Sequence, residues 1–272
     1  MTISASVVLF NCEPAIIRNL VSSLILQGVQ FVYLVDNSHS NNNSNYSDLP
    51  NTGYYHYPSN LGFGAAHNIA IEMAMLQDGG FHFVVNPDIQ LCENVISTMV
   101  NYMIEDPSIG MMMPEILNTN GSVQYLPKLL PSPLSLVKRK LKLPISGYHE
   151  FVENYELRFV PRDVIYSCPI LSGCFSLLNL EAIRNVGSYD ESFFMYFEDF
   201  DLSRRINRKY KTIYYPLIQV IHGYNSEANK SLKLLFTFVF SSIKYFNKWG
   251  WFMDRGRDKI NQQTLSQFRK CK

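Results

Sequence analysis

Carboxylates that directly follow predicted buried strands are the residues of this sequence best placed to do chemistry. The apolar and aromatic run Phe81–Val85 leads through Asn86-Pro87 to Asp88, and Phe31–Val35 leads in the same way to Asp36. A proline cannot donate to a central ladder, so the strand is predicted to end near Asn86 and to leave Asp88 in the loop beyond it. An Asp in such a loop is a hard oxygen ligand that suits Mg²⁺ or Mn²⁺ holding substrate phosphates. The same tripeptide is also typical of a turn that binds nothing.

A second group of acids lies in an aromatic-rich run, Phe193–Leu202, whose sequence is FFMYFEDFDL. Phe200–Tyr210 has helical spacing, which puts Glu198 and Asp199 at the N-terminus of a predicted helix. A carboxylate there can act as a general base and take a proton from a hydroxyl group. The structural alternative is that both acids only cap the helix and interact with its dipole.

Glycines mark two further places where a ligand could approach the backbone. The turn Asn60-Leu61-Gly62-Phe63-Gly64 opens a predicted helix that runs through Met75, and free N–H groups at a helix N-terminus can bind a diphosphate. Gly173 interrupts the apolar run Ile170–Asn179, as glycine does where a ligand comes close to a strand. His222 follows a short predicted strand, a position where a lone histidine is ordinarily structural.

These residues sit in a chain whose predicted strands and helices alternate. Such alternation indicates an α/β fold with a mostly parallel sheet and helices on both faces. The right-handed crossover rule then places Asp36 and Asp88 on one rim of the sheet. The predicted strands are Ala5–Phe10, Phe31–Val35, Gly53–Tyr57, Phe81–Asn86, Met111–Met113, Ile170–Asn179, Thr212–Tyr215 and Ile218–Ile221, and the main helices follow Pro14, Gly64, Glu93 and Phe200.

Two stretches are predicted to be loops. The Ser/Asn-rich tract His39–Ser47 indicates a polar surface loop that cannot pack. Pro127–Pro161 is rich in proline and indicates a long, partly mobile loop, in which the basic run Lys138–Lys142 forms a solvated face.

Composition narrows the class of protein. The chain has 272 residues, of which 47% are apolar, so a substantial core is expected. A net charge of +1 gives no footprint for nucleic acid. The 5 cysteines are scattered and lack metal-site spacing, which favours a reduced, cytoplasmic protein without structural disulfides. We find no signal peptide and no apolar run of the roughly 20 residues that span a bilayer.

Taken together and in this order, the motifs resemble family 2 inverting glycosyltransferases, and their rhamnosyltransferase-like branch most. The resemblance covers about Ala5 to Gly223. It implies a GT-A fold, a nucleotide-diphospho-sugar donor and a divalent cation, Mg²⁺ or Mn²⁺. The motifs that carry it are Phe10-Asn11, Val35-Asp36-Asn37-Ser38, Asn60-Leu61-Gly62-Phe63-Gly64 with Asn68, Asn86-Pro87-Asp88, Gly173, the Phe193–Leu202 run and His222.

The resemblance also implies a role for each matching residue. Asp199 is the expected general base, with Glu198 beside it. Asp88 and His222 are the expected metal ligands, and Asn86 stands where the family often has the first acid of an Asp-x-Asp motif. The expected donor site is formed by Phe10, Asn11, Asp36, Asn60, Gly62, Asn68, Asp88 and Gly173.

The expected function is transfer of a sugar, rhamnose from dTDP-rhamnose, onto a hydroxyl of a saccharide acceptor, including a lipid-linked one, in the synthesis of cell-surface polysaccharide such as O-antigen. A UDP-linked donor of galactofuranose or N-acetylglucosamine is an alternative, and so is a catalytically silent nucleotide-sugar binding protein. No Gly-x-Gly-x-x-Gly follows the first strand, which disfavours a dinucleotide oxidoreductase. Residues 1–227 are expected to form the catalytic domain, with a donor half of about 1–115 and an acceptor half of about 116–227.

The remaining residues, 228–272, are expected to form a helical segment that binds a membrane surface or a second copy of the chain. Leu232–Phe252 has a wide apolar stripe opposite Lys233, Lys244 and Lys248, with Trp249 and Trp251 near its end. A stripe of this kind packs either on protein or at the inner face of a cell membrane, and truncation after Glu227 is expected to leave a folded core. The stripe consists of Leu232, Leu235, Phe236, Val239, Phe240, Ile243 and Phe246.

Overall fold

Strands rich in β-branched and aromatic residues build one central sheet in the computed structural model, which describes residues 2–141, 147–223 and 232–268. Its strands follow the order β3-β2-β1-β4-β8-β6-β9-β5, and β7 also pairs with β9. The bounds are β1 Thr2–Leu9, β2 Phe31–Asp36, β3 Thr52–His56, β4 Gly79–Val85, β5 Ile89–Leu91, β6 Ile109–Leu117, β7 Tyr166–Ser167, β8 Phe175–Asn179 and β9 Lys211–His222.

The N-terminal half of the sheet, formed by β1 to β4, is parallel. β3, β2, β1 and β4 run in one direction, β8 is antiparallel to its neighbours β4 and β6, and β9 is parallel to β6. The predicted α/β architecture with a mostly parallel sheet is therefore confirmed.

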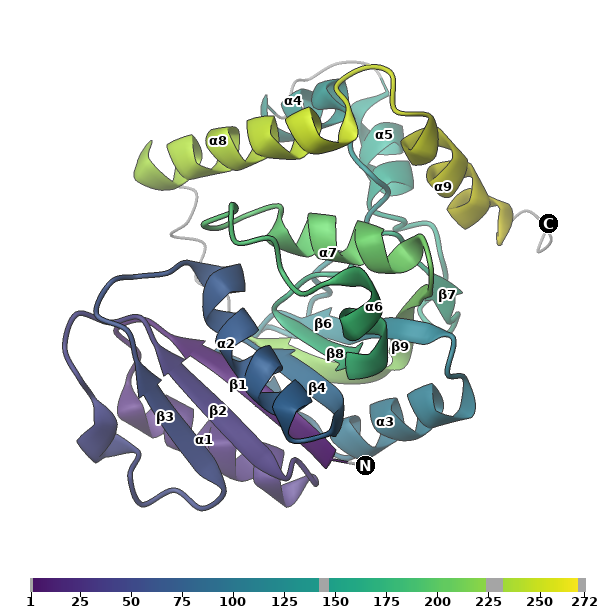
Figure 1. Ribbon diagram of the computed structural model, residues 1–272. Helices are drawn as coiled ribbons and strands as arrows, with labels where there is room; N and C mark the ends of the chain where they lie inside the picture. The colour runs from purple at the N-terminus through teal and green to yellow at the C-terminus, as the bar shows by residue number, and fades with distance from the viewer. Residues whose placement is uncertain (1, 142–146, 224–231, 269–272) are drawn as a thin grey trace.

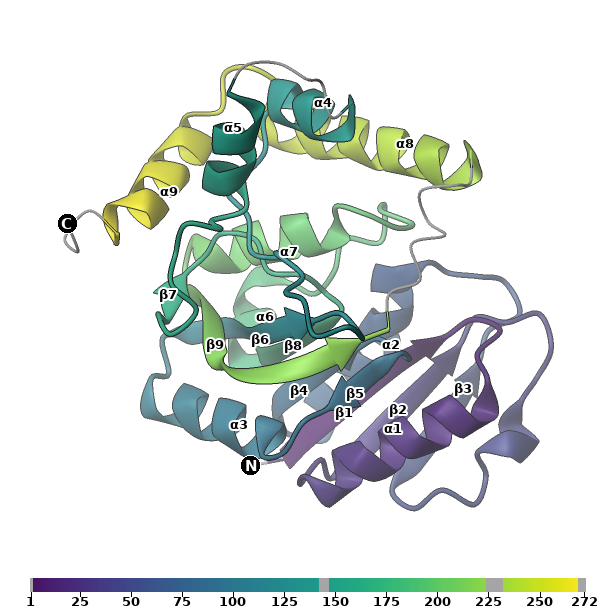
Figure 2. The same cartoon turned by 180° about the vertical axis from the view of Figure 1, so that it is seen from behind.

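Helices cover both faces of the sheet (Figures 1 and 2). Helix α2 (Phe63–Leu76), α6 (Leu180–Val186) and α7 (Glu198–Asn207) lie on one face, whereas α1 (Pro14–Leu26) and α3 (Val95–Glu105) lie on the other. Ile17 and Leu20 of α1 and Met99 of α3 are buried against the sheet, whereas Ile16 of α1 is exposed. None of the helices in the described ranges is both long and apolar enough to cross a membrane.

The strand predictions needed four corrections. β5 and β7 were missed because they have only three and two residues. β8 begins at Phe175 rather than Ile170. The two strands predicted after Thr212 are one strand, β9, whose register against β6 shifts between Tyr215 and Gln219. Pro216 lies at that shift and cannot donate to the ladder, which explains the irregularity.

The two predicted loops are also more structured than expected. The segment Pro127–Pro161 contains α4 (Pro133–Leu141) and α5 (Tyr148–Tyr155), while 142–146 fall outside the described residues. Leu129, Leu130 and Leu136 of this segment are buried, and Arg139 of the basic run pairs with Glu156 at 2.8 Å. Pro133 is tolerated because it lies in the first turn of a helix.

Helix α8 (Leu232–Trp249) and α9 (Arg255–Ser266) lie with α4 at one end of the molecule, beyond α7 (Figure 1). The predicted helix therefore ends at Trp249 instead of Phe252. The expected boundary between 227 and 228 falls outside the described residues, so it stays a prediction.

Candidate active site

The carboxyl ends of β1, β2 and β4 place the first set of polar residues on one edge of the sheet. β1 lies between the other two strands, and Leu9 pairs with Asp36 while Val7 pairs with Val85. Asp36 and Asp88 therefore follow neighbouring positions on the same rim, as predicted. Burial raises the pKa of the Cys12 thiol, and the charges of Asp36 and Asp88 raise it further, so both carboxylates lie within electrostatic reach of Cys12.

Asp36 is buried and held by three donors. The Ser38 N–H donates to Oδ1 at 2.8 Å, and the Asn42 amide and the Tyr54 hydroxyl donate to Oδ2 at 2.9 and 2.7 Å. Burial works against the charge, but these hydrogen bonds lower the pKa of Asp36 below its ordinary value. Asn42 belongs to the His39–Ser47 tract, where Tyr46 is also buried, so the prediction of a loop that cannot pack was wrong. The Asn42 side chain of this tract donates a hydrogen bond to Asp36 instead.

Phe10 and Asn11 lie at the mouth of this edge. The ring of Phe10 is about half exposed, and Asn11 has a left-handed backbone with φ 52°. The Asn11 N–H donates to the Ser38 hydroxyl at 2.8 Å, which ties the end of β1 to the loop after β2. An exposed aromatic ring at this position can stack on a flat base.

The glycine turn before α2 is shaped by a close backbone approach. Gly62 has φ 89°, and a Cβ there would lie 2.3 Å from the Phe194 carbonyl oxygen. That oxygen accepts a hydrogen bond from the Phe63 N–H at 2.9 Å, so this amide of the helix N-terminus is already taken. Asn60 accepts from the Gly62 N–H at 3.0 Å. The turn thus joins the donor half of the chain to the Phe193–Leu202 run.

Asn68 makes a second link between these regions. It is buried, its amide nitrogen donates to the Tyr189 carbonyl at 2.9 Å and to Glu191 at 3.0 Å, and its oxygen accepts from the Tyr189 N–H at 2.9 Å. All of these partners belong to the chain. We therefore assign Asn68 the role of fastening α2 to the loop before α7, and direct contact with the donor stays a prediction for it.

Asp88 and His222 lie side by side because of the short strand β5. Ile89 pairs with His222 in the sheet, and the two side chains approach at 3.3 Å between Asp88 Oδ1 and His222 Nε2. The Asn86 amide nitrogen lies 3.2 Å from the same imidazole atom. Only the family resemblance predicted that Asp88 and His222 act together. The structure shows that their side chains are in contact.

Gln124 fixes the tautomer of His222. Its amide nitrogen donates to the His222 carbonyl at 3.1 Å, which turns its oxygen toward His222 Nδ1, also at 3.1 Å. Because that oxygen can only accept, Nδ1 is the ring nitrogen that donates to Gln124, and Nε2 is the ring nitrogen that faces Asn86 and Asp88. A carboxylate oxygen and an imidazole nitrogen at one point fit a divalent cation, although the described residues contain no cluster of three such groups.

The second acid pair lies at the start of α7, as predicted. Asp199 is half-buried and accepts hydrogen bonds from the Phe200 N–H at 2.9 Å and the Gly173 N–H at 3.4 Å. Glu198 is buried, and its Oε2 has no hydrogen-bond partner among the described residues. Burial raises the pKa of Glu198 well above its ordinary value, and the neighbouring Asp199 raises it further. Glu198 is therefore the neutral member of the pair.

Lys128 favours the charge on Asp199. Burial raises the pKa of Asp199, whereas the ammonium group of Lys128 and the two N–H donors oppose that rise. Lys128 is itself buried, donates to the Leu126 carbonyl at 3.1 Å, and has its pKa lowered to about 8 by burial. It thus remains a cation at neutral pH. Lys128 was not among the predicted site residues, because it lies in the segment that was predicted to be a loop.

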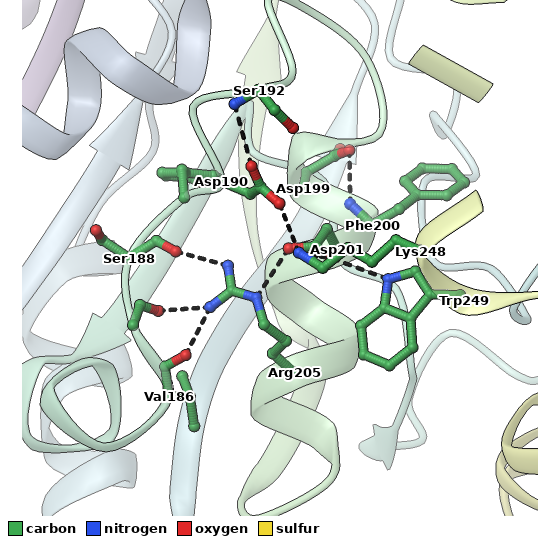
Figure 3. Close-up of polar contacts among 12 residues, drawn as sticks. Val186, Ser188, Asp190, Ser192, Asp199, Phe200, Asp201, Arg205, Lys248 and Trp249 are labelled. Atoms are coloured by element: carbon green, nitrogen blue, oxygen red, sulfur yellow. Dashed lines mark hydrogen bonds and ion pairs between the residues drawn. The ribbon is translucent and has the colours of Figure 1, made fainter. Parts of the chain in front are cut away.

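A network of charged residues fixes the orientation of α7 (Figure 3). Arg205 donates to the carbonyls of Val186, Gly187 and Ser188 and pairs with buried Asp201 at 2.8 Å. Asp201 also accepts from Lys248 and from the Trp249 indole, both on α8, at 2.8 and 2.9 Å. The last acid of the Phe193–Leu202 run is thus structural.

The two acid groups face a common region of the molecule. Burial raises the pKa of the Cys174 thiol to about 12, and the charges of Asp199 and Asp88 both raise it. Cys174 directly follows Gly173, and its carbonyl accepts from the Asn86 N–H at 2.8 Å. The loop before β8 therefore links the proposed base to the proposed metal ligands, and the site can combine proton removal with stabilisation of an anionic leaving group.

Gly173 leaves room for this loop. A Cβ at Gly173 would lie 3.0 Å from the Phe63 ring, and the residue precedes β8 instead of interrupting a strand. The glycine is thus explained by its close packing against Phe63 of α2.

A separate surface hollow, with a volume of about 420 Å³, lies beside Glu115 and Arg162. Its lining contains none of the residues that the sequence singled out, and Arg162 and Gln219 both donate to Glu115. The ion pair with Arg162 satisfies the Glu115 carboxylate.

Comparisons with known proteins place this geometry in context. No family model matches the chain. Curated relatives from two strains of Mycobacterium tuberculosis, each named N-acetylglucosaminyl-diphospho-decaprenol L-rhamnosyltransferase, are 29% identical over 185 residues. The alignment covers 64% of this chain and only 59% of the length of these relatives.

Solved structures show the same architecture. GalNAc-T7, crystallised with UDP, GalNAc and Mn²⁺, superimposes with a TM-score of 0.68, 18% identity and coverage of 96% of this chain and 49% of that one. S. aureus TarS 1–349 in complex with UDP gives a TM-score of 0.56, 14% identity and coverage of 99% and 72%. The chain therefore has the GT-A glycosyltransferase fold, and the similarity to a rhamnosyltransferase that the motifs indicated is confirmed.

Proposed function

We propose that this chain is an inverting glycosyltransferase that moves rhamnose from dTDP-rhamnose onto a hydroxyl of a lipid-linked saccharide. The observation that carries the proposal is the placement of the Asp199 carboxylate, which accepts from two N–H donors at the start of α7, on a GT-A sheet whose rim also presents Asp88 and His222. The name of the mycobacterial relatives supports the choice of sugar and acceptor class.

The proposed reaction is a single displacement. Asp199 accepts the proton of the acceptor hydroxyl as its oxygen attacks the anomeric carbon. A new carbon–oxygen bond forms on one face of the sugar while the bond to the nucleotide diphosphate breaks on the other, so the configuration inverts. Neutral Glu198 is not suited to take this proton.

Asp88 and His222 are proposed to hold a Mg²⁺ or Mn²⁺ ion together with phosphate oxygens of the donor. A bound cation would offset the charge that develops on the leaving diphosphate. GalNAc-T7 was crystallised with Mn²⁺ and UDP, which supports a divalent cation in a protein of this fold. Asn86 in place of a second acid leaves the chain with few anionic ligands, so the affinity for the free ion is expected to be modest.

The donor is proposed to lie between Phe10, Asn11 and Asp36 at the base and Asn60, Gly62 and Gly173 near the diphosphate and sugar. Phe10 offers a ring for stacking, and Asp36 is kept ionised to accept from a base N–H. A cytoplasmic location, at the inner face of the cell membrane, follows if the acceptor is lipid-linked.

A donor panel tests the proposed function. Purified protein is incubated with dTDP-rhamnose, UDP-galactofuranose or UDP-N-acetylglucosamine and with N-acetylglucosamine linked through diphosphate to a short prenyl chain, and the released nucleotide diphosphate is measured. We expect release only with dTDP-rhamnose. Release with a UDP-sugar would replace the donor assignment, and binding of nucleotide-sugar without turnover would support a silent binding protein.

A further inference from the structure

Helix α8 is attached to the rest of the molecule by one face. Ser241 donates to the Met195 carbonyl at 2.8 Å, and the Phe238 ring lies 5.3 Å from that of Phe197. Tyr245 is fully buried and packs on Phe197 at 5.4 Å. These positions recur with helical spacing, so they share one side of α8.

Two of the three lysines on the predicted basic face, Lys244 and Lys248, contact the body of the protein. Lys248 pairs with Asp190 at 2.6 Å and with Asp201 at 2.8 Å, and Lys244 donates to the Ser192 carbonyl. Trp249 donates to Asp201, with Arg204 stacked on its ring at 4.1 Å. Trp249 therefore contacts the body of the protein, whereas Trp251 is exposed.

The predicted apolar stripe lies on the opposite side of α8 and is exposed, apart from Phe246. Helical geometry sets Phe236, Val239 and Ile243 roughly opposite Ser241 and Tyr245. The alternative that this stripe packs on its own catalytic domain is therefore wrong for the described chain. The exposed fractions are 73% for Leu232, 39% for Leu235, 61% for Phe236, 42% for Val239, 64% for Phe240 and 37% for Ile243.

Further exposed apolar side chains lie at the same end of the molecule. Phe252 and Met253, in the turn between α8 and α9, are 82% and 94% exposed, and Leu134 and Val137 on α4 are 61% and 50% exposed. Figures 1 and 2 both place α4, α8 and this turn together beyond α7. Exposed apolar side chains thus occur on two helices and on the turn at this end of the molecule. We call the exposed stripe of α8, together with Phe252, Met253, Leu134 and Val137, the apolar end surface.

We propose that the apolar end surface docks on an anionic lipid membrane. Neither α8 nor α4 contains an Asp or Glu, and both carry basic residues, including exposed Lys233. Apolar residues with nearby cations and no acids suit the headgroup region of an anionic bilayer.

Docking in this way would bring the catalytic base close to lipid-linked substrate. The α8 contacts at Ser192, Met195 and Phe197 lie in the segment that leads directly into Asp199. A membrane-bound α8 would hold this segment near the headgroups, where the diphosphate and first sugar of such an acceptor lie. Only the benefit of docking for catalysis rests on the proposed function, because the docking itself needs neither donor nor acceptor.

Flotation with lipid vesicles tests the surface independently of catalysis. Full-length protein is mixed with vesicles of phosphatidylcholine and phosphatidylglycerol that contain no acceptor, and the floating fraction is measured at low and high salt. We expect flotation at low salt that weakens at high salt. The triple substitution of Phe236, Val239 and Phe240 to Ser should reduce the partition coefficient by about tenfold or more, because each apolar side chain loses its burial in lipid.

A matched control removes exposed apolar residues elsewhere. Changing Leu26, Leu76 and Ile104 to Ser takes away three exposed side chains from α1, α2 and α3, and it should leave flotation unchanged. A blue shift of Trp251 fluorescence on vesicle addition, in a Trp249→Phe background, is a second expected sign. The proposal is overturned if the full-length chain does not float at low salt, if the control loses as much as the triple variant, or if the triple variant only converts a dimer to a monomer. Loss of flotation with normal donor turnover would leave the proposed function intact.

Discussion

At the residue scale, two adjacent acids at the start of α7 carry different charges because their surroundings differ. Asp199 receives two N–H donors and faces Lys128, whereas Glu198 is buried with an oxygen that no described group satisfies. An isolated charge in such a place is costly, so the proton resides on Glu198.

This difference predicts opposite outcomes for two isosteric substitutions. Asp199→Asn removes the proton acceptor and should lower turnover about a hundredfold or more, with donor affinity nearly unchanged. Glu198→Gln replaces a neutral acid with a neutral amide and should retain most of the activity. Turnover and calorimetric donor binding measure both effects, and equal rates for Asp199→Asn and the parent would refute the assignment of the base.

Lys128 gives the site a testable pH dependence. Its charge stabilises the ionised form of Asp199, so removing it should raise the pKa of Asp199. In Lys128→Met the acidic limb of the kcat/KM profile is therefore expected to move to higher pH, since the base must be deprotonated to act. Glu198, Tyr189 and Cys174 also face Asp199 and remain in this variant. Lys128→Arg should restore the parental profile, and an unshifted profile in Lys128→Met would leave Lys128 with a purely structural role.

The Asp88 and His222 pair predicts a metal requirement that depends on Gln124. Activity should disappear in EDTA and return with Mg²⁺ or Mn²⁺. Gln124→Ala frees the imidazole to rotate and should weaken apparent metal affinity by about 10-fold to 100-fold, because residues behind a ligand have effects of this size. Metal titrations of turnover measure the shift. Full turnover in EDTA would show that cationic side chains neutralise the leaving group instead.

Motifs in the sequence could find the acids but not the groups that tune them. Asp88 and Asp199 were recognisable because each stands where a strand ends or a helix begins. Gln124 reaches His222 across 98 residues of sequence, and Lys128 reaches Asp199 from a segment with no periodic pattern. Such contacts are set by tertiary packing, for which a single sequence carries no local signal.

At the element scale, long strands and amphipathic helices were predictable, and short or proline-rich ones were not. β1, β2 and β4 have continuous apolar runs, so their placement was correct within a few residues. β5 has three residues and no pattern of its own, and yet it sets Asp88 beside His222. The prolines before α4 concealed the helical period of that segment.

A buried network of hydrogen bonds between side chains of β1, β4 and α2 predicts how stability depends on pH. Ser6 bridges His67 and His82 at 2.7 and 2.8 Å, and Ser4 contacts His82 at 2.8 Å. Burial lowers the pKa of His82 to about 3 and that of His67 well below its ordinary value. Both imidazoles are therefore neutral in the folded chain.

Below about pH 6.5 the unfolded state binds protons that the folded state does not. Stability should thus fall as pH decreases from 6.5 toward the folded pKa values, by up to about 1.4 kcal/mol per pH unit for each histidine. Denaturant unfolding between about pH 6.5 and pH 5 measures this slope. His82→Gln should make it shallower, whereas His149→Gln, at an exposed position, should not change it. An equal slope in His82→Gln and the parent would contradict the neutral assignment.

At the scale of the whole molecule, α7 connects the sheet to the C-terminal helices. Arg205 of α7 contacts the loop before the helix. Asp201 pairs with Lys248 of α8, and Arg204 pairs with Asp254 at the start of α9. The general base stands at the first turn of α7. The geometry of the catalytic region therefore depends on residues beyond the expected boundary at 227.

The buried pair Arg204–Asp254 provides the strongest test of this coupling. Its atoms approach at 2.7 Å, Asp254 also caps α9 by accepting from the Arg257 N–H, and Tyr245 and Trp249 enclose the guanidinium. Removing one partner leaves the other charge buried without compensation, which typically costs about 3–5 kcal/mol. Arg204→Met should therefore lower the free energy of unfolding by about that amount, while Arg18→Met, which breaks an exposed pair with Asp48, should change it far less. If the C-terminal helices are integral to the fold, unfolding monitored by circular dichroism and by tryptophan fluorescence will coincide in both variants. Separate transitions, with only the fluorescence change shifted in Arg204→Met, would instead identify residues after 227 as an independent unit.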